Sequence, residues 1–165
     1  MLPWFALDPW GNPQVVNITL ALCLPREGPS VGIARHICRD ALASLGVSDE
    51  CVADVELAVT EACTNVLRHA ASGSHEYEVQ VEIDERTCQI RVIDAGDNFR
   101  LAEEEMPAPV TAETGRGLFL MRAMVDHFDL DHEPKAGTVV KLTKELAFDG
   151  RPHLRLAAVP RDSTT

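Results

Sequence analysis

The spacing of apolar residues divides the first half of the chain into one strand and two helices. Residues 14–24 are rich in β-branched side chains and partly alternate in polarity, which predicts a strand. Residues 30–45 repeat their apolar positions at intervals of three and four, which predicts a helix that Ser30 caps and Gly46 ends. A second helix is predicted over residues 48–70, with its apolar stripe on one side.

The second half of the chain changes to a period of two. Residues 76–84 and 88–93 alternate apolar and polar side chains across a short polar turn, which predicts an antiparallel hairpin with one buried face. A third helix is predicted over residues 118–125, followed by strands at 128–132 and 138–146. The pattern indicates an α/β domain.

Three segments lack a periodic pattern. Residues 1–13 combine aromatic side chains with three prolines, which predicts an irregular N-terminal arm. Residues 94–115 are rich in turn formers, acidic residues and prolines, so we expect a mobile surface segment there. Residues 147–165 are expected to form a disordered tail. The folded domain is therefore expected to span residues 14–146.

Composition narrows the possible classes of protein. The chain has 165 residues, of which 45% are hydrophobic, which suits one domain with one core. A formal net charge of −11 argues against direct nucleic-acid binding, because phosphate contacts need clustered Lys and Arg. A protein partner or a small ligand is expected instead.

Cysteine usage and hydropathy indicate the compartment. The 5 cysteines are an odd number at scattered positions, so we expect buried thiols in a reducing environment rather than disulfides or a zinc site. The sequence contains neither an apolar run of roughly 20 residues nor a signal-peptide pattern. A cytoplasmic protein without a membrane segment is the expectation.

The second predicted helix carries a polar stripe beside its apolar one. Glu61, Asn65 and His69 lie four residues apart, so all three face the same side of the helix at the border of the core. An acid, an amide and an imidazole at such a border can reach a metal ion or a reacting hydroxyl. The alternative is an ordinary solvated flank with weak local pairing.

Three glycine-containing turns follow downstream, and each is a weak signal alone. Asp94 and Gly96 stand at the end of a predicted strand, where a carboxylate can accept a hydrogen bond from a ligand, although such residues also form ordinary turns. Gly115 and Gly117 precede a predicted helix, where backbone N–H groups can approach a phosphate. Thr138 follows a third glycine at the start of the final strand.

In combination these patterns are specific. The segments EACTNVLRHA, VIDAGDNF and ETGRGLFLM, in this order, make the chain similar to the GHKL superfamily of nucleotide-binding ATPases and kinases. Within it the chain resembles the anti-sigma-factor serine/threonine kinases, also called switch-protein kinases. The resemblance implies a two-layer α/β sandwich, the Bergerat fold, with a mixed, mostly antiparallel sheet covered on one face by helices, and a site for ATP and Mg²⁺.

The resemblance also implies roles for the phosphate side of the site. Glu61 would be the general base that deprotonates the acceptor hydroxyl, and Asn65 would hold Mg²⁺ against the triphosphate. Gly115 and Gly117 would cradle phosphates, while Arg116 between them would either meet the γ-phosphate or face water. These roles suit phosphoryl transfer, which depends mainly on positioning and charge neutralisation.

On the base side, the resemblance assigns Asp94 to the adenine amino group. Gly96 would let the base approach, and Thr138 would reach adenine, directly or through water. His69 stays undecided between a phosphate contact and a structural role.

The expected partners also come from the resemblance. They are a STAS-type anti-sigma-factor antagonist, which would be the substrate, and a sigma factor, with a homodimer as the expected assembly. Arg35, rather than Arg39, lies at the family's distance ahead of Glu61 for a partner contact. The alternative is a nucleotide-binding regulatory module that captures a partner without phosphoryl transfer. A sensor histidine kinase fragment is less favoured, because no dimerisation helix with an acceptor histidine is evident.

Overall fold

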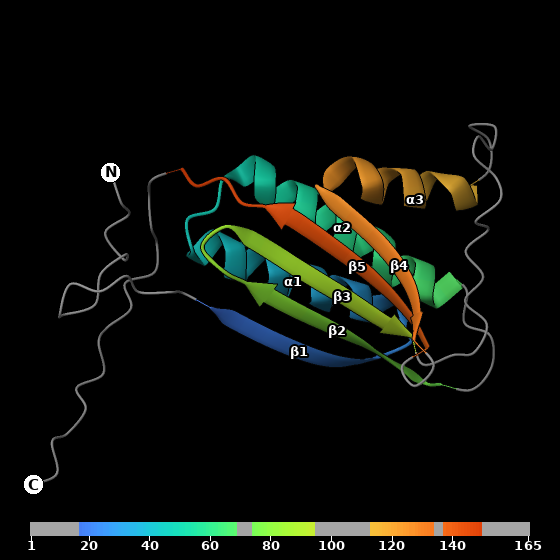
Figure 1. Ribbon diagram of the computed structural model, residues 1–165. Helices are drawn as coiled ribbons and strands as arrows, with labels where there is room; N and C mark the ends of the chain where they lie inside the picture. The colour runs from blue at the N-terminus through green and yellow to red at the C-terminus, as the bar shows by residue number, and fades with distance from the viewer. Residues whose placement is uncertain (1–16, 69–73, 95–112, 134–136, 150–165) are drawn as a thin grey trace, which may run out of the picture.

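The computed structural model describes residues 17–68, 74–94, 113–133 and 137–149, which form two layers (Figure 1). Three helices lie on one face of a five-stranded sheet, and α3 lies beside α2. In chain order the elements are β1 (Ile18–Pro25), α1 (Gly28–Ser44), α2 (Asp49–Arg68), β2 (Glu76–Ile83), β3 (Thr87–Asp94), α3 (Glu113–Met124), β4 (His127–Glu133) and β5 (Gly137–Glu145). The expected α/β sandwich is confirmed.

The sheet has the strand order β1-β2-β3-β5-β4, and its four neighbouring pairs are all antiparallel. Because β3 and β4 are both antiparallel to β5, they run in the same direction, and α3 connects them as a crossover. The helical hairpin of α1 and α2 returns the chain so that β1 and β2 are antiparallel neighbours. The C-terminal end of β3 lies beside the N-terminal end of β5, since these two strands are antiparallel neighbours in the sheet.

The core lies between the helices and the inner face of the sheet. The alternation predicted for the hairpin is confirmed, since Tyr77, Val79, Val81 and Ile83 are all buried. The apolar stripe of α2 is buried as well; its members are Cys51, Val52, Val55, Ala58, Val59, Ala62, Cys63 and Val66. This stripe makes α2 the central helix of the layer and holds its polar flank in a defined orientation.

Two predicted helix starts are wrong. Helix α1 begins at Gly28, so Ser30 lies inside it, where its buried Oγ bonds the carbonyl oxygen of Glu27 at 2.7 Å and the hydroxyl of Tyr77 at 2.9 Å. Helix α3 begins at Glu113 rather than after the glycine motif. In both helices the first turn contains glycine or proline, whose low propensity hides the true start from a periodicity analysis.

The turn between α1 and α2 has the chemistry that the sequence predicts. Gly46 has a φ of 79°, the left-handed conformation that glycine adopts without strain, and it ends α1 as expected. The N–H of Cys51 donates to Ser48 Oγ at 3.4 Å, which confirms Ser48 as the cap of α2. The same turn pairs with residues 147–149, through a bridge between Val47 and Phe148. These first three residues of the expected tail are thus attached to the domain, and residues 150–165 lie outside the described ranges, as does the N-terminal arm.

All 5 cysteines are free thiols. Four of them are buried as expected, whereas Cys23 is exposed, because it lies on the outer face of the edge strand β1. Burial raises the pKa of Cys38 and of Cys63 to about 12, so these thiols stay protonated at neutral pH. They are packing residues of the core.

Asp84, in the turn between β2 and β3, is expected to make a pH-dependent contribution to the free energy of unfolding. Burial alone would raise the pKa of Asp84, but the N–H groups of Arg86 and Thr87, at 2.7 and 2.6 Å, and the Thr87 hydroxyl outweigh it and lower that pKa. A depressed carboxyl pKa stabilises the fold fully above the unfolded-state value of about 3.9, and the contribution is lost as the pH falls through the folded pKa. We expect Asp84→Ala to lower the free energy of unfolding at pH 7 and to lose most of this effect near pH 2.

Urea unfolding of both proteins across this pH range measures the effect. Asp129 is an exposed control, since its side chain bonds only the adjacent Leu130 N–H among the described contacts. A difference between wild type and Asp84→Ala that stays constant with pH would contradict the assignment.

Candidate active site

Helix α2 presents two of the three polar residues expected to form the site. Asn65 is buried, with 5% of its surface exposed, and Glu61 is half-buried one turn earlier on the same side. Their position follows from the buried apolar stripe, which leaves this flank at the border of the core. His69 lies outside the described residues.

Helix α3 brings the glycine motif directly against this flank. A Cβ atom added to Gly117 would lie 2.8 Å from Glu61 Oε2 and 3.5 Å from Asn65 Oδ1. The first of these distances is shorter than real Cβ contacts, so a side chain at this position would force the Glu61 carboxylate to move. The structure therefore brings the acid and the amide of α2 together with Gly117 of α3.

Asp94 and Thr138 form a second cluster at the ends of β3 and β5. They are cross-strand partners in the register of the sheet, and each is only 3% exposed. Thr138 Oγ1 is buried and has no hydrogen-bond partner among the described residues. Since an unsatisfied buried hydroxyl is costly, this atom is available to form a hydrogen bond with a bound molecule or water.

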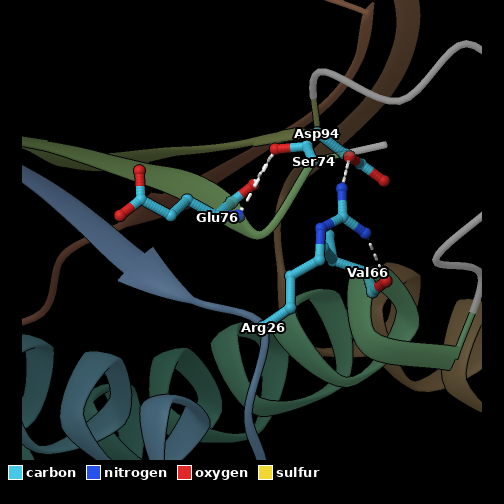
Figure 2. A network of polar contacts seen from close by, with 5 residues as sticks. All are labelled: Arg26, Val66, Ser74, Glu76 and Asp94. Carbon is cyan, nitrogen blue, oxygen red and sulfur yellow. Dashed lines mark hydrogen bonds and ion pairs between the residues drawn. The ribbon is translucent and has the colours of Figure 1, made fainter. Parts of the chain in front are cut away.

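Arg26 links the two clusters and was missed in the sequence. Its Nη2 forms an ion pair with Asp94 Oδ1, and its Nη1 donates to the carbonyl oxygen of Val66 at 3.3 Å, as Figure 2 shows. Val66 follows Asn65 in α2, so the guanidinium connects the end of β3 with the helix that carries Glu61. A single arginine in the turn after β1 carries no periodic or motif signal, which is why only the structure identifies it.

The other predicted site residues have different positions. Gly96 lies outside the described residues, and Gly115 lies in the first turn of α3. Arg116 is exposed on α3. Arg35 is half-buried on α1, with Nη2 3.5 Å from His36 Nε2, and it has no carboxylate partner among the described residues, whereas Arg39 pairs with Asp40 at 2.9 Å.

Known proteins are similar to this chain in sequence. The profile of the family described as the histidine kinase-like ATPase domain matches residues 24–144. A serine-protein kinase RsbW of Bacillus velezensis is 30% identical over 134 residues, which are 74% of this chain and 82% of that protein. The serine-protein kinase RsbW of Listeria monocytogenes is 32% identical over 136 residues, covering 76% of this chain and 85% of that protein.

Two solved structures are similar in fold. The RsbU and RsbW domains of a Mycobacterium tuberculosis protein match with a TM-score of 0.60 at 22% identity, over 82% of this chain and 34% of that longer chain. A chain of the SiaB-SiaC complex from Pseudomonas aeruginosa matches with a TM-score of 0.51 at 14% identity, over 76% of this chain and 89% of that chain. At these identities the likeness concerns the fold alone.

The family match spans most of the chain and includes both clusters, so this protein belongs to the histidine kinase-like ATPase domain family. Within that family it belongs with the RsbW-type serine-protein kinases, and it is accordingly a protein serine/threonine kinase. The resemblance read from the sequence is confirmed. No helix in the described ranges combines the length and hydropathy that a membrane crossing requires.

The described residues fit ATP, the nucleotide that the family implies. Thr138 Oγ1 offers an unpaired polar atom beside Asp94. No group of three or more His, Cys, Asp or Glu suited to a metal occurs in the described ranges. Asn65 Oδ1 fits Mg²⁺, which commonly takes one or two protein oxygens and completes its shell with phosphate and water.

Proposed function

We propose that this kinase uses Mg-ATP to phosphorylate a serine or threonine of a small STAS-type anti-sigma-factor antagonist, and that it also sequesters a sigma factor. The observation that carries the proposal is the approach of Gly117 to Glu61 and Asn65. It joins a base, an oxygen ligand and backbone donors of a helix start in one place, which are the parts that phosphoryl transfer requires. The names of the RsbW relatives support the same chemistry.

Each residue of the site has its own proposed role in phosphoryl transfer. Glu61 accepts the proton of the attacking hydroxyl, since its carboxylate is half-buried at the border of the core and lies beside Gly117 of α3. Asn65 holds Mg²⁺, whose charge neutralises the phosphates when it is bound. The N–H groups at the start of α3 bind the phosphates, because they lack partners within the helix and lie at its positive end. Asp94 and Thr138 bind the adenine.

Partner binding is proposed for the outer surface of α1. Arg35 has no carboxylate partner among the described residues, and Ile33 on the same helix is 47% exposed. Arginine is enriched in protein interfaces, and an exposed apolar side chain adds area that a partner can bury. The proposal includes a cytoplasmic location and a homodimer.

A transfer assay tests the proposed function. The purified protein is incubated with Mg²⁺, γ-labelled ATP and each STAS-type protein of its host, and the products are analysed for phosphoserine and phosphothreonine. Labelling of one antagonist supports the proposal, and co-purification with mass spectrometry identifies the sigma factor. If every antagonist of the host remains unlabelled, the proposed substrate class is wrong.

A further inference from the structure

Arg26 is anchored on two sides in the interior of the site. Its side chain is 9% exposed and that of Asp94 is 4% exposed, so the ion pair is shielded from water. The second contact, from Nη1 to the Val66 carbonyl oxygen, fixes the plane of the guanidinium against α2 (Figure 2). A planar group held at two points determines where the carboxylate of Asp94 lies.

The positive charge of Arg26 beside Asp94 also favours the ionised form of that carboxyl group. A carboxyl group buried to this degree tends to bind a proton at neutral pH, because burial disfavours the charged form. A neighbouring guanidinium reverses this preference and keeps the carboxylate ionised. An ionised carboxylate only accepts hydrogen bonds, whereas a protonated one also donates.

This difference selects between purine bases. The 6-amino group of adenine donates hydrogen bonds, and the 6-oxo group of hypoxanthine or guanine only accepts them. An ionised Asp94 therefore pairs with adenine and repels a 6-oxo purine, while a protonated Asp94 can donate to the 6-oxo group. The unpaired Oγ1 of Thr138, on the strand neighbour of Asp94, indicates that a ligand completes the hydrogen bonding at this place.

We propose that Arg26 is a positioning residue that sets the base specificity of the nucleotide site by keeping Asp94 an acceptor-only carboxylate. This inference rests on the proposed function, which locates adenine at Asp94. It extends the site to the turn after β1, outside every motif in the sequence. Arg26 acts through Asp94 and contacts no reacting atom.

The test compares the affinities of ATP and inosine triphosphate, which differs from ATP in carrying the 6-oxo group. Isothermal titration calorimetry is run with wild type, Arg26→Met and Arg26→Lys. We expect Arg26→Met to lower the ratio of ATP to inosine triphosphate affinity by at least about tenfold, the size expected for one hydrogen bond to a charged group. Arg26→Lys keeps the positive charge but loses the planar guanidinium group. This variant should retain most of the wild-type ratio of ATP to inosine triphosphate affinity.

Two features make the result decisive. The ratio of the two nucleotide affinities is measured on one sample and does not depend on the fraction of folded protein. Partial unfolding of Arg26→Met therefore leaves the ratio interpretable. If Arg26→Met cannot be isolated, Arg26→Gln takes its place. In an Asp94→Asn background, Arg26→Met should leave the ratio unchanged, because Arg26 acts only through the carboxylate.

The outcomes separate this inference from the proposed function. An unchanged ratio in Arg26→Met, or an equal change in the Asp94→Asn background, overturns the role of Arg26 while ATP binding by wild type stands. If wild type binds neither nucleotide, the proposed function fails and this inference fails with it.

Discussion

Replacing Glu61 with glutamine is expected to lower the rate of phosphoryl transfer by about 10²- to 10⁴-fold, the usual contribution of a general base. Glutamine keeps the size of the side chain and its hydrogen-bonding capacity beside Gly117, but it cannot accept a proton from the attacking hydroxyl. Binding of ATP and of the partner should persist, because Asn65, Asp94 and Thr138 are unchanged. Single-turnover transfer from γ-labelled ATP measures the rate, and calorimetry measures the affinity.

Glu56 provides a matched control for this substitution. It is a half-buried carboxylate on the same helix, and it lies outside the proposed site. Glu56→Gln should transfer phosphate at the wild-type rate. Equal transfer rates in wild type and Glu61→Gln would show that Glu61 is not the general base. No transfer by either protein, with partner binding intact, would favour the alternative in which the chain is a nucleotide-binding regulatory module.

Replacing Gly117 with alanine is expected to lower the transfer rate by about tenfold or more, since misplacement of a catalytic group by about 1 Å can cost 10²-fold. The new Cβ would lie 2.8 Å from Glu61 Oε2, so the carboxylate has to move. The cost to the fold should be small, because Glu61 Oε2 is the end of a flexible side chain and alanine favours the helix by about 1 kcal/mol over glycine. Transfer rate and thermal midpoint are measured together.

Gly32 is the control for the chemistry of glycine replacement itself. It lies within α1, and a Cβ added there meets nothing within 4 Å. Gly32→Ala should keep wild-type activity and gain slightly in stability. Adding Gly117→Ala to Glu61→Gln should cost little further activity, because both act on one carboxylate. Wild-type activity in Gly117→Ala would show that Glu61 is not positioned for catalysis as proposed.

Sequence could predict those parts of the candidate site whose position follows from a single helix or strand. The stripe of Glu61 and Asn65 follows from helical spacing, and Asp94 follows from its place at the end of an alternating strand. Their assigned roles came from the resemblance to a kinase family, and these roles stay predictions. The start of α3 was predicted too late, because glycine lowers the helical signal of its first turns.

What the sequence by itself determined is therefore local: the order of the elements, their inward faces and the motifs at their ends, all of which depend on spacing along one segment. Only the tertiary structure decided which segments meet. Contact between Gly117 and Glu61 needs α3 to pack on α2, and the ion pair of Arg26 with Asp94 joins residues 68 positions apart. Such contacts depend on how the helices and the sheet pack as rigid units, and no spacing within a segment encodes them.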